Sequence, residues 1–132
     1  MPNKKAQTAI ELIIVMSFLI FFFIIFMGVI QGKIQEKSEE KKTIIIKDIV
    51  KTIQEEIDLA TKSTDGYRRE FKLPEKIIND DYEISIFEGI VYAKTTDQKH
   101  AIAVNIKNVT GNISNEETNI ITKQNGIIRI NQ

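Results

Sequence analysis

The chain has 132 residues, with 18 basic and 18 acidic side chains and therefore a formal net charge of zero. A charge this close to neutral gives no electrostatic support for nucleic-acid binding, and the absence of cysteine excludes disulfides and thiolate metal sites. The length is sufficient for one small domain in addition to a separate helix.

The first predicted element is an apolar segment that begins soon after Lys4 and Lys5. From Leu12 to Gly32 the sequence contains no ionisable residue, and roughly 20 mainly apolar residues are enough to cross ~30 Å of hydrocarbon as a helix. A buried helix of a small soluble domain would not need to be apolar on every face. The segment therefore predicts a single membrane-spanning helix.

The residues that flank the apolar segment predict its orientation. Lys4 and Lys5 precede it, and positive charge next to a span favours the cytoplasmic side. The stretch that follows, residues 33–43, mixes both signs and carries a weaker bias. We therefore expect a cytoplasmic N-terminus, with the chain from about residue 33 onward outside the cell.

Glu11 is the one charge inside the otherwise apolar run, and it has two interpretations. In the first, Thr8 and Glu11 form a capping box, in which Thr8 caps the helix and Glu11 bonds back to the Thr8 amide. In the second, the carboxylate serves a function with a partner, because a charge close to an apolar span is costly when it has none. The residues by themselves leave both open.

The N-terminal pattern as a whole resembles the class III signal peptide of archaeal type IV pilin-like proteins. That signal combines basic residues, a small residue, Gln, and an apolar helix with Glu at the fifth mature position. The matching residues in this chain are Lys4, Lys5, Ala6, Gln7 and Glu11. The resemblance implies that a prepilin-type peptidase cleaves between Ala6 and Gln7 on the cytoplasmic side. A leader of residues 1–6 would be removed, and the helix of residues 7–32 would be kept.

The resemblance also implies two tasks for the retained helix, which are membrane anchoring and packing against copies of itself in a filament core. Glu11 would face the new amino group of Gln7 on a neighbouring subunit, where opposite charges attract strongly at low dielectric. Gly28 and Gly32 form a small-xxx-small pattern that permits close helix approach, although they also fit a simple exit from the membrane. Ala9 stands where many relatives carry Ser.

Residues 33–63 are expected to continue the helix into an amphipathic stretch. The polar residues 33–43 include weakly helix-supporting pairs such as Lys33 and Glu36. Beyond them, apolar residues recur at helical spacing and form one stripe, which predicts a near-continuous helix from about residue 8 to residue 62. The stripe consists of Ile46, Ile49, Val50, Ile53, Ile57 and Ala60.

Residues 64–132 are predicted to form an extracellular antiparallel β domain. Gly66 suits the position after a helix, and the apolar period then changes to two. Asn125-Gly126 lies between two apolar runs and strongly indicates a hairpin. The whole predicts an α+β fold, with the stripe covering a meander of about five or six strands. The expected strands lie at 70–73, 82–86, 90–95, 101–106, 119–123 and 127–130.

The sequence contains no catalytic set and no phosphate-binding loop that we regard as significant, so we expect no enzyme activity, no metal and no cofactor. His100 is expected to be a solvated loop residue. A carboxylate-rich run lacks the spacing of a calcium loop and fits a plain turn better than a cation site. The run comprises Asn79, Asp80, Asp81 and Glu83.

Asn108 and Asn112 each begin a glycan acceptor sequon in a predicted outer loop. Such matches also arise by chance in an Asn-rich chain, but the resemblance favours their use. The function expected from the resemblance is that of a structural or minor subunit of a pilus-like surface filament, in adhesion, surface attachment or assembly. The alternative is a membrane-anchored monomeric binding module. A secreted protein that loses the whole apolar run agrees less well, because that run is longer than a usual signal-peptide core.

Overall fold

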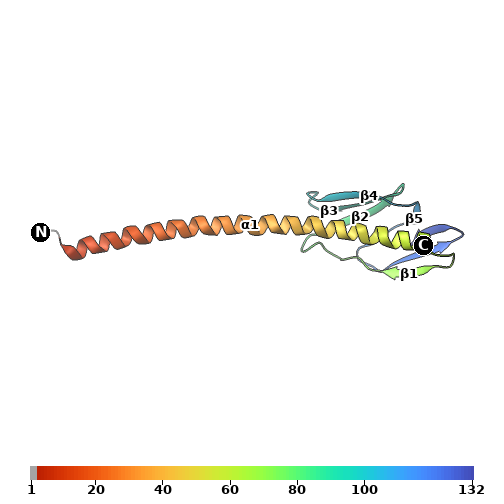
Figure 1. The fold of residues 1–132 in the computed structure, drawn as a ribbon, viewed down its shortest axis with the longest axis horizontal. Helices are drawn as coiled ribbons and strands as arrows, with labels where there is room; N and C mark the ends of the chain where they lie inside the picture. The colour runs from red at the N-terminus through yellow and green to blue at the C-terminus, as the bar shows by residue number, and fades with distance from the viewer. Residues whose placement is uncertain (1–2) are drawn as a thin grey trace. The chain divides into compact units, whose positions relative to one another are not determined.

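The computed structural model describes residues 3–132, and in them one α-helix is followed by seven β-strands (Figure 1). This is the expected α+β class. The chain divides into two compact units, one ending at Glu39 and the other spanning Glu40–Gln132. The elements are α1 (Lys4–Lys62), β1 (Arg68–Phe71), β2 (Tyr82–Phe87), β3 (Ile90–Thr95), β4 (Ala101–Asn105), β5 (Val109–Gly111), β6 (Asn119–Gln124) and β7 (Ile127–Ile130).

Helix α1 begins at Lys4, which is earlier than the predicted start near residue 8. The carbonyl oxygen of Asn3 accepts hydrogen bonds from the amides of Ala6 at 2.8 Å and Gln7 at 3.2 Å. Lys, Ala and Gln are all good helix formers, so the residues before Thr8 extend the helix without strain. The helix ends at Lys62, as predicted.

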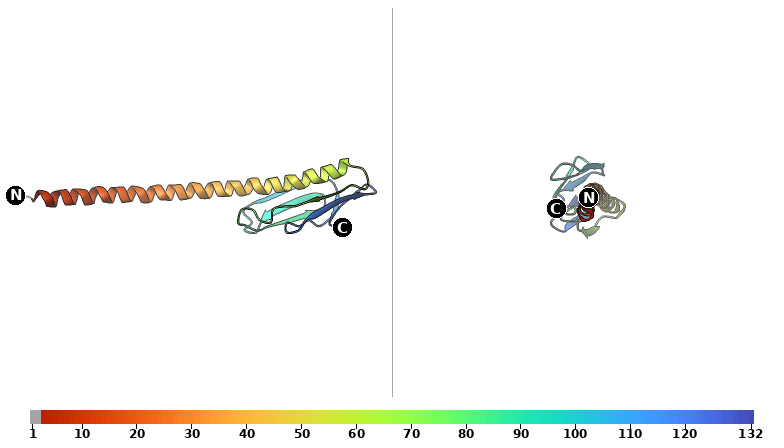
Figure 2. Two further views of the ribbon diagram at one scale, coloured as in Figure 1. Left: turned by 90° about the horizontal axis from the view of Figure 1, so that it is seen from below. Right: turned by 90° about the vertical axis from the view of Figure 1, so that its left-hand side faces the viewer.

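The apolar stripe in the second part of α1 is buried, as predicted. All six of its residues, from Ile46 to Ala60, have exposed fractions of 3 % or less. Both sheets lie on the same side of this part of the helix (Figure 2). Full burial of an Ile side chain contributes roughly 1.5–3 kcal/mol, so the stripe holds the helix and the sheets together as one hydrophobic core.

The β domain consists of two sheets, which corrects the prediction of one antiparallel meander of five or six strands. One sheet has the order β1-β6-β7-β5 and the other has the order β2-β3-β4. Neighbouring strands are antiparallel except β5 and β7, which pair in parallel. β5 was missed because it has only three residues, in a stretch rich in turn formers, and depends on its pairing with β7.

The predicted hairpin at Asn125-Gly126 is present between β6 and β7. Both turn residues have positive φ, 50° for Asn125 and 74° for Gly126. These are the conformations that a type I′ turn requires, and Asn and Gly adopt them most easily. The expected strand through Leu73 ends earlier, at Phe71, although Leu73 remains buried in the core.

Candidate functional site

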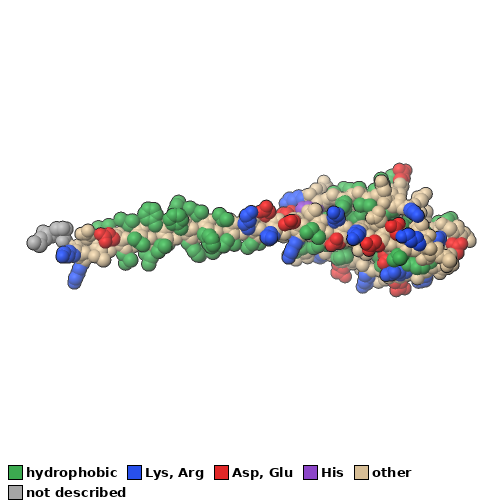
Figure 3. Space-filling model, in the orientation of Figure 1, with side chains coloured by type: hydrophobic (Ala, Val, Ile, Leu, Met, Phe, Trp, Pro, Cys, Tyr) green, Lys and Arg blue, Asp and Glu red, His purple; other side chains and the backbone are tan. Residues whose placement is uncertain are grey.

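The most prominent surface of the first unit is the apolar part of α1. Apart from the half-buried Ile30, its large side chains are exposed, with exposed fractions from 38 % for Met27 to 65 % for Phe22. Hydrophobic side chains cover this part of the helix (Figure 3). None of its most apolar stretch is buried among the described residues. The helix is therefore long and apolar enough to span a membrane.

The few polar groups of this segment are compatible with an apolar environment. Ser17 donates its hydroxyl to the carbonyl oxygen of Ile13 at 2.8 Å, within the helix. Such a bond satisfies the hydroxyl without water. An exposed apolar surface this large on one chain indicates a contact with lipid or with other protein chains.

The polar beginning of α1 does not form the capping box that was one interpretation of Glu11. Thr8 lies inside the helix and donates its hydroxyl to the carbonyl oxygen of Lys4 at 2.9 Å. Glu11 is exposed and accepts a hydrogen bond from the Gln7 side chain at 3.3 Å. Because the helix begins at Lys4, the Thr8 amide has no need of a cap, and Glu11 has no capping role in this structure.

The expected cleavage site, Ala6-Gln7, lies in the first two turns of α1, and both residues are exposed. Gln7 and Glu11 are four residues apart and so lie on the same face of the helix. The structure thus brings together the residue expected to carry the new amino group and the carboxylate expected to pair with such a group on a neighbour.

In the second unit, Asn108 and Asn112 are both exposed on either side of β5. The hydroxyl of the first sequon, Thr110, donates to the carbonyl oxygen of Ile128 at 3.4 Å. The hydroxyl of the second, Ser114, accepts the amides of Glu116 at 3.2 Å and of its neighbour Glu117 at 3.3 Å. The two sequons therefore differ in the role of their hydroxyl groups: the first donates a hydrogen bond to a neighbouring strand, and the second accepts hydrogen bonds from the residues that follow it.

Each carboxylate of the 79–83 run forms an ion pair with a different lysine. Asp80 pairs with Lys42 at 2.7 Å, Asp81 with Lys76 at 3.1 Å, and Glu83 with Lys94 at 3.1 Å. Within residues 3–132, no group of three or more His, Cys, Asp or Glu residues has a geometry that could hold a metal ion. The run acts as a turn that is tied to the helix and the neighbouring strand.

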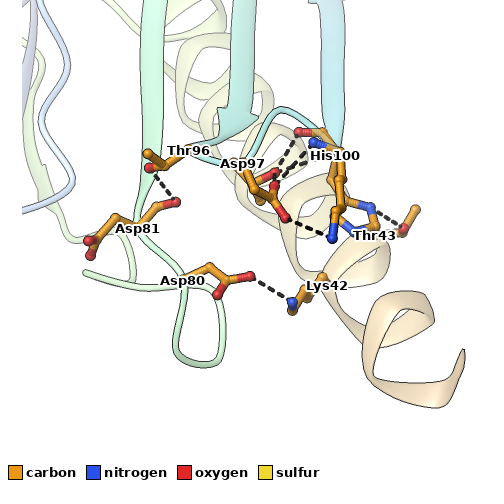
Figure 4. Close-up of polar contacts among 9 residues, drawn as sticks. Lys42, Thr43, Asp80, Asp81, Thr96, Asp97 and His100 are labelled. Carbon is orange, nitrogen blue, oxygen red and sulfur yellow. Dashed lines mark hydrogen bonds and ion pairs between the residues drawn. The ribbon is translucent and has the colours of Figure 1, made fainter. Parts of the chain in front are cut away.

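His100 is half-buried rather than solvated, which corrects the expectation for this residue. Its Nδ1 atom lies 3.0 Å from the hydroxyl oxygen of Thr43 on α1 (Figure 4). The sequence around His100 does not predict this contact, because Thr43 and His100 are 57 residues apart in the chain. The contact forms because the β2-β3-β4 sheet packs against α1 and so places the β3–β4 loop beside the helix.

Comparisons with known proteins add no family to this description: the chain matches no protein-family model, no curated protein and no solved structure.

Proposed function

We propose that this chain is a structural or minor subunit of an archaeal type IV pilus-like surface filament. Its apolar helix would anchor it in the membrane before assembly and would pack against other subunits afterwards. The β domain would form the outer surface, with a role in adhesion, surface attachment or assembly. The proposed partners are the membrane, a prepilin-type peptidase and further pilin subunits, and no catalytic role is involved.

The observation that carries this proposal is an apolar helix segment that is exposed on all sides, in a chain whose second unit has its own core. The residues of that core come from α1 beyond Glu39, from the strands and from the connection between β1 and β2, and they include Ile53, Val91 and Ile77. The core therefore needs nothing from the segment between Leu12 and Gly32. Covering each large apolar side chain there is worth roughly 1.5–3 kcal/mol, which favours lipid or neighbouring copies as its environment.

The arrangement of Gln7 and Glu11 supports a filament over a simple anchor. Removal of residues 1–6 would give Gln7 a positively charged amino group next to an apolar segment. Glu11 lies on the same helix face and, within residues 3–132, makes only a long, exposed side-chain contact, with Gln7. Its carboxylate is thus accessible to the amino group of a neighbouring subunit, and burial of both charges together would fix the axial register between subunits.

Two measurements test the proposal, the first on native protein and the second on tagged protein. Intact-protein mass spectrometry should give a mature chain that begins at Gln7. Electron microscopy of cells that carry a tag after the exposed Gln132 should show labelled filaments. In the control variant Ala6→Trp, a bulky residue replaces the small one at the expected cleavage site, so the leader should be retained and the filaments lost.

Other outcomes would count against the proposal in distinct ways. A mature mass that corresponds to cleavage beyond residue 25 would exclude both a filament helix and a membrane anchor. Correct processing with membrane-bound protein but no labelled filaments would favour the monomeric anchored binding module instead.

A further inference from the structure

A small cavity lies within the second unit, between α1 and the beginning of β4. Its volume is about 250 Å³. Ile46 and Ile102 supply apolar surface, and four polar side chains complete the wall, two from the helix and two from the β3–β4 loop. The polar wall consists of Thr43, Lys47, Lys99 and His100.

The charged groups of this wall are all potential cations. Among the lining residues, which all belong to the described part of the chain, there is no Asp or Glu. Lys47 makes no ion pair within residues 3–132. Lys99 lies 3.8 Å from Asp97, and its side chain is 66 % exposed, so the pair is weak. By contrast Lys42, with a side chain only 14 % exposed, is held at 2.7 Å by Asp80 and serves the fold.

Asp97 belongs to the same β3–β4 loop as the lining residues Lys99 and His100, and other groups already hold its carboxylate. It accepts hydrogen bonds from the Thr95 hydroxyl at 2.5 Å and from the Lys99 amide at 3.1 Å. The bond from Thr95, followed by the bond from Lys99, lowers the pKa of the Asp97 carboxyl below its ordinary value. Asp97 therefore organises the loop that presents Lys99 and His100 to the cavity.

The position of the His100 ring in the wall is fixed by its contact with Thr43 at 3.0 Å (Figure 4). A ring held from the helix side keeps the β3–β4 loop against α1, so that Lys99 and Lys47 face the same cavity. The cavity is smaller than the roughly 300–1,000 Å³ of pockets that enclose drug-sized ligands. Its size therefore suits a compact group rather than a nucleotide or a large cofactor.

We propose that this cavity binds a phosphate group, with Lys47 and Lys99 as its two cationic ligands. A lysine ammonium is a compact charge with three hydrogen-bond donors, and it binds phosphate in many proteins. Thr43 and His100 add polar groups to the same wall. The phosphate comes either from solution or from the headgroup of an anionic lipid. This binding is independent of filament assembly, because it uses only residues of the second unit.

The experiment uses the full chain in dodecyl maltoside micelles, which contain no phosphate, at low ionic strength and near neutral pH. Inorganic phosphate is titrated while the amide NMR signals of Thr43, Lys99 and His100 are followed. We expect saturable shifts, with affinity reduced about tenfold in either Lys47→Gln or Lys99→Gln. Lys51→Gln is the matched control, because Lys51 lies one turn beyond Lys47, is 68 % exposed and faces Glu55 instead.

A second arm identifies the source of the phosphate group. The same signals are compared in nanodiscs of phosphatidylcholine alone and of an equimolar mixture with phosphatidylglycerol. Shifts that need phosphatidylglycerol and disappear in the Lys47 and Lys99 variants assign the site to a lipid headgroup. Shifts with inorganic phosphate alone assign it to a soluble ligand. The proposal is wrong if neither ligand gives saturable shifts, if chloride at equal ionic strength reproduces them, or if Lys51→Gln weakens them equally.

Discussion

Lys123 of β6 donates a hydrogen bond from its ammonium group to the carbonyl oxygen of Ser63, at 2.7 Å. The same ammonium lies 2.8 Å from the carbonyl oxygen of Thr61. The last carbonyls of a helix lack partners within the helix and carry partial negative charge. A lysine from the sheet thus supplies both the hydrogen bonds and the positive charge that the end of α1 needs, and it ties the helix to the four-stranded sheet.

We expect Lys123→Met to lower the free energy of unfolding of the β domain by about 1–3 kcal/mol, because partly buried carbonyls lose a charged donor. Urea unfolding of the full chain in detergent would measure this through tyrosine fluorescence, since the sequence has no tryptophan. Lys51→Met is the control and should cost under about 0.5 kcal/mol, because its pair with Glu55 at 3.7 Å is exposed. Equal losses would show that the Lys123 contact adds nothing.

Gly111 at the end of β5 is expected to tolerate no side chain. Its φ is +117°, and a Cβ atom there would overlap the carbonyl oxygen of Ile130. Gly111→Ala should therefore cost at least about 3 kcal/mol in the same urea experiment. Gly126 also has positive φ, at +74°, but apart from its two chain neighbours no described residue lies within 4 Å of a Cβ there, so Gly126→Ala should cost only about 1–2 kcal/mol. Similar losses would contradict the close β5–β7 approach.

Tyr82 is expected to make the stability of the domain decline at alkaline pH. Burial raises the pKa of its hydroxyl from 10 to about 12, and the hydroxyl donates to the carbonyl oxygen of Pro74 at 2.5 Å. As pH rises, the unfolded chain loses this proton before the folded chain does. The stabilisation that the protonated Tyr82 hydroxyl gives to the fold is therefore complete below about pH 10 and is lost between about pH 10 and 12.

The variant Tyr82→Phe should remove this alkaline decline and should cost about 1 kcal/mol near neutral pH through the lost hydrogen bond. Urea midpoints measured by circular dichroism across this pH range would test it. Tyr92→Phe, on the partly exposed outer face of β3, is the control and should keep the decline. If the stability of Tyr82→Phe still declined at alkaline pH as in the wild type, the decline would be due to other groups.

Glu11→Gln separates the filament from the anchored module. If Glu11 pairs with the Gln7 amino group of a neighbour, Gln leaves that amine without a counter-charge in an apolar core, which is strongly unfavourable. Processing and membrane insertion should persist, while filaments become sparse or absent. The measurement is a count of labelled filaments for both proteins at matched levels. Equal counts would remove the intersubunit role of Glu11.

The elements that could be predicted from the sequence are those that depend on contacts near in sequence. The stripe from Ile46 to Ala60 follows the helical period, and burial of one face is enough to specify both the helix and the side it packs. Asn125-Gly126 specifies its own turn, because few other residues adopt positive φ at two successive positions. The exposed apolar segment of α1 likewise follows directly from its composition.

Only the tertiary structure decided how the strands are divided and which polar groups are buried. Asn119 is fully buried. It accepts hydrogen bonds from the Ser114 amide at 2.8 Å and from the Asn131 side chain at 2.9 Å. Nothing in the turn-rich stretch before it predicts this network, or the pairing of β5 with β7. Such features form only when distant segments meet, since a short strand or a buried amide is stable only when its partners are in place.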